Sequence, residues 1–256
     1  MTLVDTHLHL HFSQYDADRD EVIQRAFQNG FRYLLNIGTD LEDSQKAIAV
    51  AEQYPQVYAA VGYHPHETQT ANEIDLAVIE KLLAHPKVVA IGEVGLDYFH
   101  DHSPRSVQQK LLRVFLAWYQ QHRKPLIIHC RDAYEDLMRI LQESVEPPFN
   151  GVLHCFSSTG DIMKKYLDLG FHIAFGGALT YKKNDALRDA CRHCPKDRLL
   201  LETDAPYLPP QTKRGQRNEP FYMIETLECA AGIHSMSAEA MADLTTANAV
   251  RLFGLC

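Results

Sequence analysis

Six residues of this chain carry metal-ligating side chains and stand where an apolar run ends. His7 and His9 close the first run, residues 3–9. Because side chains alternate faces along a β-strand, residues two apart point the same way, and both imidazoles can reach one ion. The remaining four each close a later run: Glu93, His129, His154 and Asp204. Imidazole and carboxylate groups without thiolates are ligands for divalent cations such as Mg, Mn and Zn.

The size of this set predicts two divalent metal ions per chain. We expect the two N-terminal histidines and Asp204 to hold one ion, and His129 with His154 to hold the other. Glu93 would bridge both ions through its two oxygens. Two ions roughly 3.5–4 Å apart can activate a water and hold the attacking and leaving oxygens of a phosphoester. The chemistry indicated is metal-dependent hydrolysis, with Asp204 as general base and Glu93 as the second catalytic carboxylate.

These residues can come together only if the strands that carry them end at a common edge of a sheet. The sequence shows the alternation of strands and helices that such a sheet requires. Eight apolar runs alternate with amphipathic stretches, near residues 3–8, 31–37, 57–62, 88–92, 125–129, 151–155, 171–175 and 198–202. No linker rich in Pro, Gly or Ser interrupts the series. The length of 256 residues and this alternation predict an α/β protein, a (β/α)8 TIM barrel forming one domain over residues 1–256.

Helix start signals lie between the apolar runs. Asp40 is expected to cap a helix over 42–53, and Ser103 with Pro104 to open a long helix that ends near residue 122. Two further helices, near 219–232 and 237–251, would complete the barrel, the second capped by Ser237.

The apolar residues that precede the ligands favour a barrel over an open sheet. Ile91, Ile127 and Val152 are expected to share the inward face of the ligand two positions later. A barrel interior is packed with branched apolar side chains, and polar groups belong at its mouth. A single histidine at such a position is more often a buried imidazole with ordinary hydrogen bonds than a ligand. Six ligand-type residues at strand ends favour a metal site instead.

These residues lie in a series of short motifs that resembles the TatD family. The motifs are DTHLH at 5–9, GYHPH at 62–66, IGEVGLD at 91–97, IHCRDA at 128–133, LHCF at 153–156, LETDAPYL at 201–208 and RNEP at 217–220. The family belongs to the amidohydrolase-like metal-dependent hydrolases, and its characterised members include magnesium-dependent deoxyribonucleases with exonuclease activity. The resemblance implies metal roles for the six residues and places His64 and Arg131 near the substrate. Some members have lost the first His-x-His pair, whereas this chain keeps it, so both metal sites should be complete.

Cationic side chains near the strand ends could contact a phosphate. Arg131 stands one inward step beyond His129 and could bind a phosphate oxygen bidentately. Arg217 follows the last strand in a basic loop with Lys213 and Arg214. Such a cluster is either a solvated loop or a phosphate-binding element, and its place at the mouth keeps both interpretations open.

Histidines and aromatic residues next to the ligands suggest further contacts with a substrate. His64 and His66 share the inward parity of the third strand, so one of them could touch a phosphate or leaving group. Both could equally be loop histidines ordered by Pro65. Tyr98 and Phe99 follow Glu93, and an aromatic ring there could stack on a base.

Composition limits the partners and the compartment. A formal net charge of −8 argues against nucleic-acid binding by bulk attraction, although two ions and a few local cations could supply the field where it is needed. No apolar stretch approaches a membrane span, and the N-terminus lacks a secretory pattern. The six cysteines are scattered, which suits reduced thiols. We therefore expect a cytoplasmic protein without membrane association or an obligate protein partner.

The combined features predict a hydrolase that cleaves phosphodiester bonds in DNA, with single-stranded ends as its substrate. The main alternative is a superfamily hydrolase acting on an ester, amide or lactone, such as a deacylase of mischarged tRNA. Many such relatives bridge their metals with a carbamylated lysine at the end of strand 4, where this chain has Glu93. A second alternative is a metal-binding scaffold without activity, which the complete ligand set disfavours.

Overall fold

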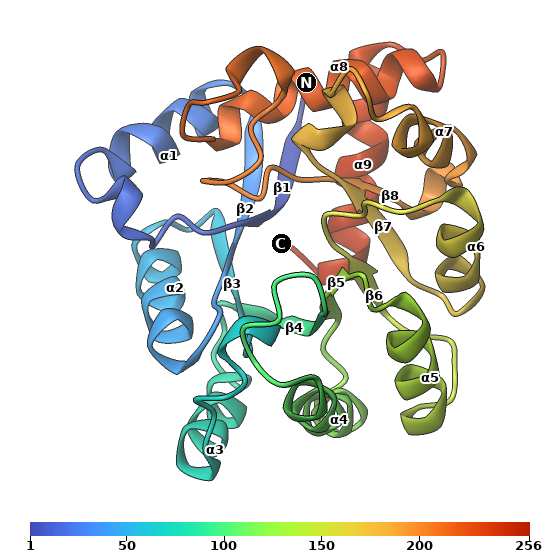
Figure 1. The fold of residues 1–256 in the computed structure, drawn as a ribbon. Helices are drawn as coiled ribbons and strands as arrows, with labels where there is room; N and C mark the ends of the chain where they lie inside the picture. Colours follow the sequence, from blue (N-terminus) through green and yellow to red (C-terminus); the bar gives the residue numbers. More distant parts are fainter.

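The chain folds into a (β/α)8 TIM barrel, as the alternation of apolar runs predicts. The computed structural model describes all 256 residues, and its eight parallel strands are hydrogen-bonded in chain order (Figure 1). The strands are β1 Leu3–Leu8, β2 Phe31–Ile37, β3 Val57–Val61, β4 Val88–Asp97, β5 Leu126–Arg131, β6 Gly151–Leu153, β7 His172–Phe175 and β8 Leu199–Leu201. Every strand begins within one residue of the start predicted for it, and only β4 extends well past its predicted end.

Helices follow the strands and surround the barrel. They are α1 Arg19–Gln28, α2 Leu41–Gln53, α3 Glu73–Leu82, α4 Arg105–His122, α5 Tyr134–Ser144, α6 Gly160–Asp168, α7 Asp185–His193, α8 Met223–Ile233 and α9 Ala238–Phe253. Two predicted caps are confirmed. The Asp40 carboxylate accepts the Asp43 N–H at 2.8 Å, and the Ser237 hydroxyl accepts the Ala240 N–H at 3.1 Å. Ser103 does not cap α4, because its hydroxyl donates instead to a backbone carbonyl in the loop after β3.

The barrel closes between β8 and β1 through irregular backbone. Leu8 and Ala205 form an isolated parallel bridge, and the His9 N–H donates to the Ala205 carbonyl at 2.8 Å. One step earlier, the Asp204 N–H donates to the His7 carbonyl at 2.9 Å. These bonds place the end of β1 against the segment after β8, so residues almost 200 positions apart in sequence become neighbours.

The apolar residues form two layers. The interior of the barrel receives at least one side chain from each strand: Val4, Leu35, Ala60, Ala90, Ile127, Val152, Ala174 and Leu200. Leu252 and Phe253, at the end of α9, belong to the same cluster and cover the end of the barrel where the strands begin. A larger cluster packs the outer face of the sheet against the helices. Polar residues therefore occupy the other end of the barrel interior.

The predicted inward position of Ile91 is wrong, although Ile127 and Val152 lie inside as expected. Ala90 belongs to the interior cluster, whereas Ile91 packs in the layer between the sheet and the helices. The register between β4 and β5 shifts between Ile91 and Val94. Because of this irregularity, strict alternation of faces does not continue from Ile91 to Glu93.

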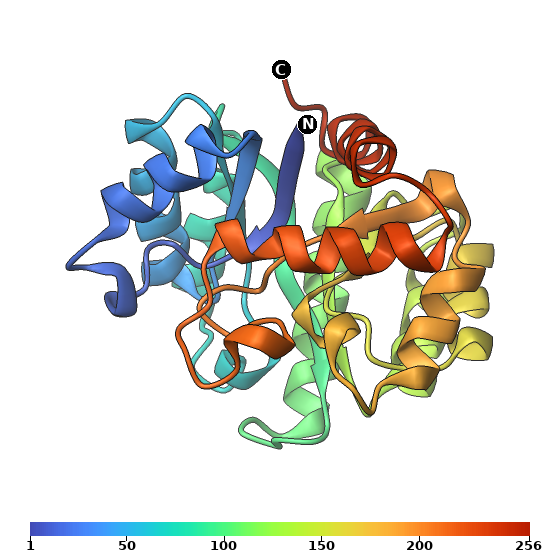
Figure 2. The same cartoon turned by 90° about the horizontal axis from the view of Figure 1, so that it is seen from above.

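The two ends of the barrel differ in what they carry. Figure 2 shows both chain termini at one end and the loop after β4, drawn in green, at the other. The second end, formed by the carboxyl ends of the strands, is called the mouth below. None of the helices is both long enough and apolar enough to cross a membrane.

Candidate metal centre

A cavity of about 540 Å³ opens at the mouth and contains most of the predicted site. Its walls include five of the six predicted ligands and two of the predicted substrate contacts: His9, Glu93, His129, His154, Asp204, His64 and Arg131. The sixth ligand, His7, has no exposed surface and lies beneath the floor of the cavity. The structure therefore brings together side chains from β1, β4, β5, β6 and the segment after β8.

Glu93 lies at the centre of this cluster, and its two carboxylate oxygens face different histidines. Oε2 lies 3.2 Å from His7 Nε2 and 3.9 Å from His9 Nε2. Oε1 lies 2.8 Å from His129 Nδ1 and 2.8 Å from His154 Nε2. Each oxygen thus faces one of the two pairs of histidines expected from the sequence, and the rings of His7 and His154, from different pairs, stack with their centres 3.8 Å apart.

Asp204 completes the group on the His7 side. Its Oδ1 lies 3.8 Å from His7 Nε2 and 3.6 Å from His9 Nε2, and 13 % of its side chain is exposed to the cavity. The Asp204 backbone has a φ of 57°, in the left-handed region that non-glycine residues seldom adopt. Backbone of this kind is held by its surroundings and is frequent at functional sites.

A buried acidic side chain, Asp5 on β1, fixes this geometry. Asp5 Oδ1 accepts the His7 N–H at 3.2 Å and the Thr203 N–H at 3.0 Å. Burial raises the pKa of Asp5 to about 8, so desolvation outweighs these hydrogen bonds. The two strand ends that carry His7 and Asp204 are therefore tied to one side chain.

Hydrogen bonds to the remote nitrogens orient two of the ligand histidines, His9 and His129. His9 Nδ1 bonds a backbone carbonyl at the end of β2 at 2.8 Å. His129 Nε2 bonds Asp97 Oδ2 at 3.0 Å. His154 Nδ1 lies 3.5 Å from Glu202 Oε1 without a hydrogen bond. Partners of this kind hold the ring and its tautomer so that the other nitrogen faces the metal. Reasoning from the sequence missed Asp97, although it continues the two-residue step from Glu93.

The donor set fits metal ions because several buried polar atoms have nothing else to bind. Both ring nitrogens of His7, Nδ1 of His154 and Oε2 of Glu202 are buried without a hydrogen-bond partner. Leaving such atoms unsatisfied costs about 1–3 kcal/mol each. Donor atoms of His7, His9 and Asp204 all lie within 4.8 Å of one another, a spacing that one cation can span.

The two central carboxylates carry the negative charge that cation ligands require, whereas the same carboxylates raise the pKa of His9, His129 and His154 against the effect of burial. Burial alone would raise the pKa of Glu93, but His154, His64 and His7 outweigh it and hold that pKa well below its usual range. Burial also opposes ionisation of Asp204, yet its hydrogen bond to His9 and the neighbouring imidazoles lower the pKa. Both carboxylates are therefore anionic at neutral pH. Burial lowers the pKa of His7, which keeps a lone pair free on its ring.

His64 lies inside the cluster, closer to the ligands than a loop histidine would be. Its Nε2 lies 3.3 Å from Glu93 Oε1 and 3.3 Å from His129 Nδ1. Burial lowers the pKa of His64 to about 4, so this imidazole is neutral at neutral pH. His66 also lines the cavity, one step farther from Glu93.

The predicted cations divide into one that reaches the cavity and three that do not. Arg131 lines the cavity, and its guanidinium carbon lies 4.7 Å from the centre of the Phe99 ring. Arg217 is instead paired with the Asp18 carboxylate through two bonds of 2.7 and 2.6 Å. A third bond joins it to the Gln14 carbonyl at 2.6 Å. The structure does not support a phosphate contact for Arg217, because its donors already have partners away from the cavity.

The neighbouring cations of the basic loop also lie on aromatic rings. Lys213 Nζ is 5.1 Å from the Tyr222 ring centre, and the Arg214 guanidinium carbon is 4.8 Å from the Tyr181 ring centre. Neither residue lines the cavity. The three cations of this loop thus pack against the protein rather than over the metal ligands.

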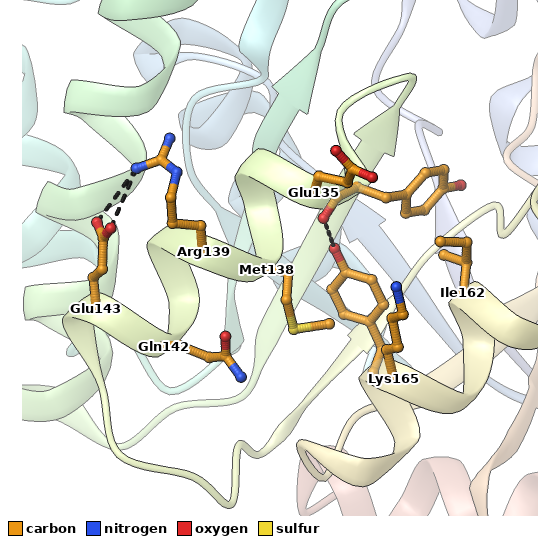
Figure 3. A pocket seen from close by; sticks show the side chains of 9 residues that line it. Glu135, Met138, Arg139, Gln142, Glu143, Ile162 and Lys165 are labelled. Atoms are coloured by element: carbon orange, nitrogen blue, oxygen red, sulfur yellow. Dashed lines mark hydrogen bonds and ion pairs between the residues drawn. The ribbon is translucent and has the colours of Figure 1, made fainter.

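A second hollow, of about 440 Å³, lies outside the barrel between α5 and α6 (Figure 3). It shares no residue with the mouth cavity. Arg139 on its rim is paired with Glu143 and with Asp136, and the Tyr166 hydroxyl donates to the Tyr134 carbonyl. Since no metal-ligand set converges there, this hollow is not the candidate metal centre, which lies at the mouth.

Comparison with known sequences finds relatives along almost the whole chain. The sequence model of the TatD related DNase family matches residues 4–254. The uncharacterized metal-dependent hydrolase YabD of Bacillus subtilis is 41 % identical, over 98 % of this chain and 98 % of its own length. The 3'-5' ssDNA/RNA exonuclease TatD of Musicola paradisiaca is 36 % identical, over 99 % of this chain and 98 % of its own length.

Solved structures agree with the sequence comparison. YjjV, a TatD homologue from Escherichia coli K12, superimposes with a TM-score of 0.94 at 32 % identity, over 99 % of this chain and 98 % of that one. The organophosphorus hydrolase of Deinococcus radiodurans reaches a TM-score of 0.70 at 14 % identity, over 98 % of this chain and 92 % of that one. The second likeness concerns the fold alone.

Proposed function

This chain belongs to the family of TatD-related DNases and is a metal-dependent hydrolase acting on ester bonds. From this premise we propose that it hydrolyses the phosphodiester bonds of single-stranded DNA ends and uses two divalent ions to do so. The proposal adds a number of ions and a substrate to the family assignment. It also assigns roles to several of the residues that line the mouth cavity.

The observation that carries the proposal is the position of Glu93. One of its oxygens faces His7 and His9, and the other faces His129 and His154. A carboxylate that separates two groups of buried imidazoles in this way is suited to bridge two ions. The four histidines and Asp204 would hold these ions, with three ligands on one side and two on the other besides Glu93.

Asp204 is the residue we assign as general base. Its carboxylate is ionised and partly exposed to the cavity, so one oxygen can ligate while the other accepts a proton. The bound ions would act as Lewis acids and lower the pKa of a water, which narrows the gap that the proton must cross. His64, neutral and 3.3 Å from Glu93, lies where it can donate to or accept from a group in the cavity.

Aromatic and cationic side chains around the cavity suit a single strand. Phe99 is 58 % exposed beside Arg131, and Tyr207 is 49 % exposed on the cavity wall. Unpaired bases stack on exposed rings at about 1–3 kcal/mol per base, whereas paired bases are already stacked in a duplex. Arg131 can bind a phosphate oxygen. Because the chain has a net charge of −8, such local contacts must replace bulk attraction.

The test is hydrolysis by protein from which metal has been removed. The depleted protein should leave a 5'-labelled single-stranded oligonucleotide intact, and addition of Mg²⁺, Mn²⁺ or Zn²⁺ should restore stepwise release of nucleotides. A duplex of the same sequence should be cut more slowly. Absence of hydrolysis with every ion would refute the proposed substrate.

The same assay addresses the alternative substrates. No lysine lines the cavity, so the lysine-bridged centre of many ester and lactone hydrolases has no equivalent here. Turnover of an aminoacyl ester or a lactone, together with inactivity on DNA, would replace the nuclease proposal by that alternative.

Two arginines form a matched pair for testing the phosphate contact. Arg131→Ala should raise KM for DNA and reduce the slope of log KM against log salt by about 0.7, the value for one single-strand phosphate contact. Arg217→Ala should leave the slope unchanged, because that guanidinium is paired with Asp18. Equal changes in both variants would mean that the slope reports general charge and not a contact of Arg131.

A further inference from the structure

A second group of metal-ligand side chains lies on the wall of the mouth cavity, beside the central cluster. Asp97 ends β4, His66 lies in the short 3-10 turn Pro65–Glu67, and His100 follows in the loop after β4. Asp97 Oδ2 lies 3.0 Å from His66 Nε2 and 3.0 Å from His100 Nδ1. His102, which also lines the cavity, packs its ring 4.6 Å from that of His66.

The loops that carry this group are fixed in place. Asp97 Oδ1 accepts the backbone N–H groups of Phe99 and His100 at 3.0 and 2.9 Å. Gln108, on α4, accepts the Asp97 N–H at 2.8 Å and donates to the Asp97 carbonyl at 3.0 Å. Asp97 is therefore held by its neighbours on both sides, independently of the histidines.

A further bond joins the two loops to each other. The Ser103 hydroxyl donates to the His66 carbonyl at 2.6 Å and accepts the Gln69 N–H at 3.1 Å. The loop after β3 and the loop after β4 are thus connected directly beneath the histidines. This arrangement preorganises His66 and His100 around one carboxylate oxygen.

Hydrogen bonding alone does not account for the convergence on Asp97 Oδ2. Three imidazole nitrogens, from His66, His100 and His129, each lie 3.0 Å from this single oxygen. A carboxylate oxygen has two lone pairs, so three N–H donors exceed what it accepts well. A cation bound by two of the imidazoles and Asp97 would leave the His129 N–H on the remaining lone pair.

We infer that His66 Nε2, His100 Nδ1 and Asp97 Oδ2 form an additional divalent-cation site, separate from the two ions of the central cluster. These three donors lie within 4.8 Å of one another. Two imidazoles and a carboxylate suit Zn²⁺ or a similar transition ion, and three protein ligands with an open position are typical of sites exposed to a cavity. Metal–ligand distances of about 2.0–2.2 Å place tetrahedral donors roughly 3.3 Å apart, close to the separations around Asp97.

The additional ion would be coupled to the central cluster through a shared carboxylate. Asp97 Oδ2 also bonds the remote nitrogen of His129, whose other nitrogen lies 2.8 Å from Glu93. For this reason Asp97 is unsuitable for the test, because its substitution would affect both sites. The rings of His66 and His100 bond Asp97 and form no hydrogen bond with any of the six central ligands.

The inference is tested by counting bound ions in variants of the untagged protein. Wild type, His100→Ala and His66→Ala are dialysed against micromolar Zn²⁺, and zinc per chain is measured. A surface control is His122→Ala, since His122 pairs with Glu80 alone at 3.1 Å. Both cluster variants should bind one ion fewer than wild type, and the control should bind the wild-type number. Circular dichroism before counting verifies that each variant is folded.

Cobalt gives a second readout that does not depend on absolute counts. Replacement of Zn²⁺ by Co²⁺ should produce a visible absorption component that is lost in His100→Ala and kept in His122→Ala. Equal metal content and equal spectra in wild type and both cluster variants would overturn the inference. Because the comparison uses differences between variants, it stands or falls separately from nuclease activity and from the number of central ions.

Discussion

Each end of the barrel buries a histidine whose ring nitrogens lack hydrogen-bond partners, and the two histidines have opposite surroundings. His7, at the mouth, has no exposed surface and faces the carboxylates of Glu93 and Asp204. His172, the first residue of β7, is 5 % exposed and lies near the positive charges of Arg198 and Arg251. Burial lowers the pKa of both rings.

The difference shows what makes a buried histidine a ligand. Both rings are neutral at neutral pH and could offer a lone pair to a metal. Only His7 has anionic oxygens close enough to share a cation with it, whereas the cations near His172 would repel one. A buried histidine with an unsatisfied nitrogen is therefore insufficient evidence for a metal site. Carboxylates close to the ring distinguish a metal ligand from an ordinary buried histidine.

Removing the Glu93 carboxylate should have the largest effect on metal content and activity. Without it, the mouth should bind metal no better than the opposite end of the barrel does. Glu93→Ala is expected to lose both central ions and to reduce DNA hydrolysis to the background of the assay, because no other group faces both sets of histidines. His7→Ala should lose mainly one ion. Metal content measured after gel filtration checks both variants, and full occupancy in Glu93→Ala would exclude a bridging role.

Replacing the base should separate coordination from proton transfer. Asp204→Asn keeps the size and one coordinating oxygen but cannot accept a proton, so kcat should fall by roughly 10²–10⁴-fold. Binding of DNA should change little, because Arg131 lies on another strand. The variant needs kcat and metal content from one preparation. A loss of metal would show that coordination alone explains the defect, and near-normal turnover would contradict the assignment of the base.

Weakening an orienting bond should have a smaller effect at the mouth. Asp97→Asn replaces the carboxylate that bonds His129 Nε2, and substitutions at such positions typically reduce metal affinity or activity about 10–100-fold. The apparent affinity for the activating ion should fall more than kcat at saturating metal. A reduction of kcat that excess metal does not diminish would indicate a role beyond orienting His129.

The smallest effect is expected at the opposite end of the barrel. His172→Leu should leave metal content and DNA hydrolysis unchanged while altering how stability depends on pH. The His172 imidazole binds a proton near pH 6.5 in the unfolded chain but only near pH 4 in the folded chain. The contribution of neutral His172 to the free energy of unfolding is therefore fully present above pH 6.5 and is lost as the pH falls toward 4. The leucine variant should therefore be more stable than wild type at pH 4.

The size of this stability difference follows from the two pKa values. The difference in unfolding free energy between His172→Leu and wild type should be roughly 2–3 kcal/mol more favourable to the variant at pH 4 than at pH 7. Urea titrations of both proteins at the two pH values measure it, and parallel pH profiles would show that His172 is already free to bind a proton in the folded state.

Much of this arrangement was predictable because a ligand at the end of a strand is a local signal. The apolar run before His129 predicts where β5 ends, and barrel topology then places that end at the mouth. The same reasoning located His7, Glu93, His154 and Asp204.

Other features depend on contacts that no local pattern contains. Arg217 looked like a phosphate ligand because its loop follows β8, but its partner Asp18 lies 199 residues earlier in the chain. The register shift after Ile91 changes which face each residue presents, so alternation misplaced Ile91. Asp97 became visible as a functional residue only when β4 proved to extend beyond the predicted end at residue 92.

Anomalous X-ray scattering from crystals grown with Mn²⁺ tests the central claim most directly. The account predicts two anomalous peaks on opposite sides of the Glu93 carboxylate, one beside His7, His9 and Asp204 and the other beside His129 and His154. No peak should appear at His172. An empty site at Glu93 in fully active protein, or a single ion bound away from this carboxylate, would contradict the account.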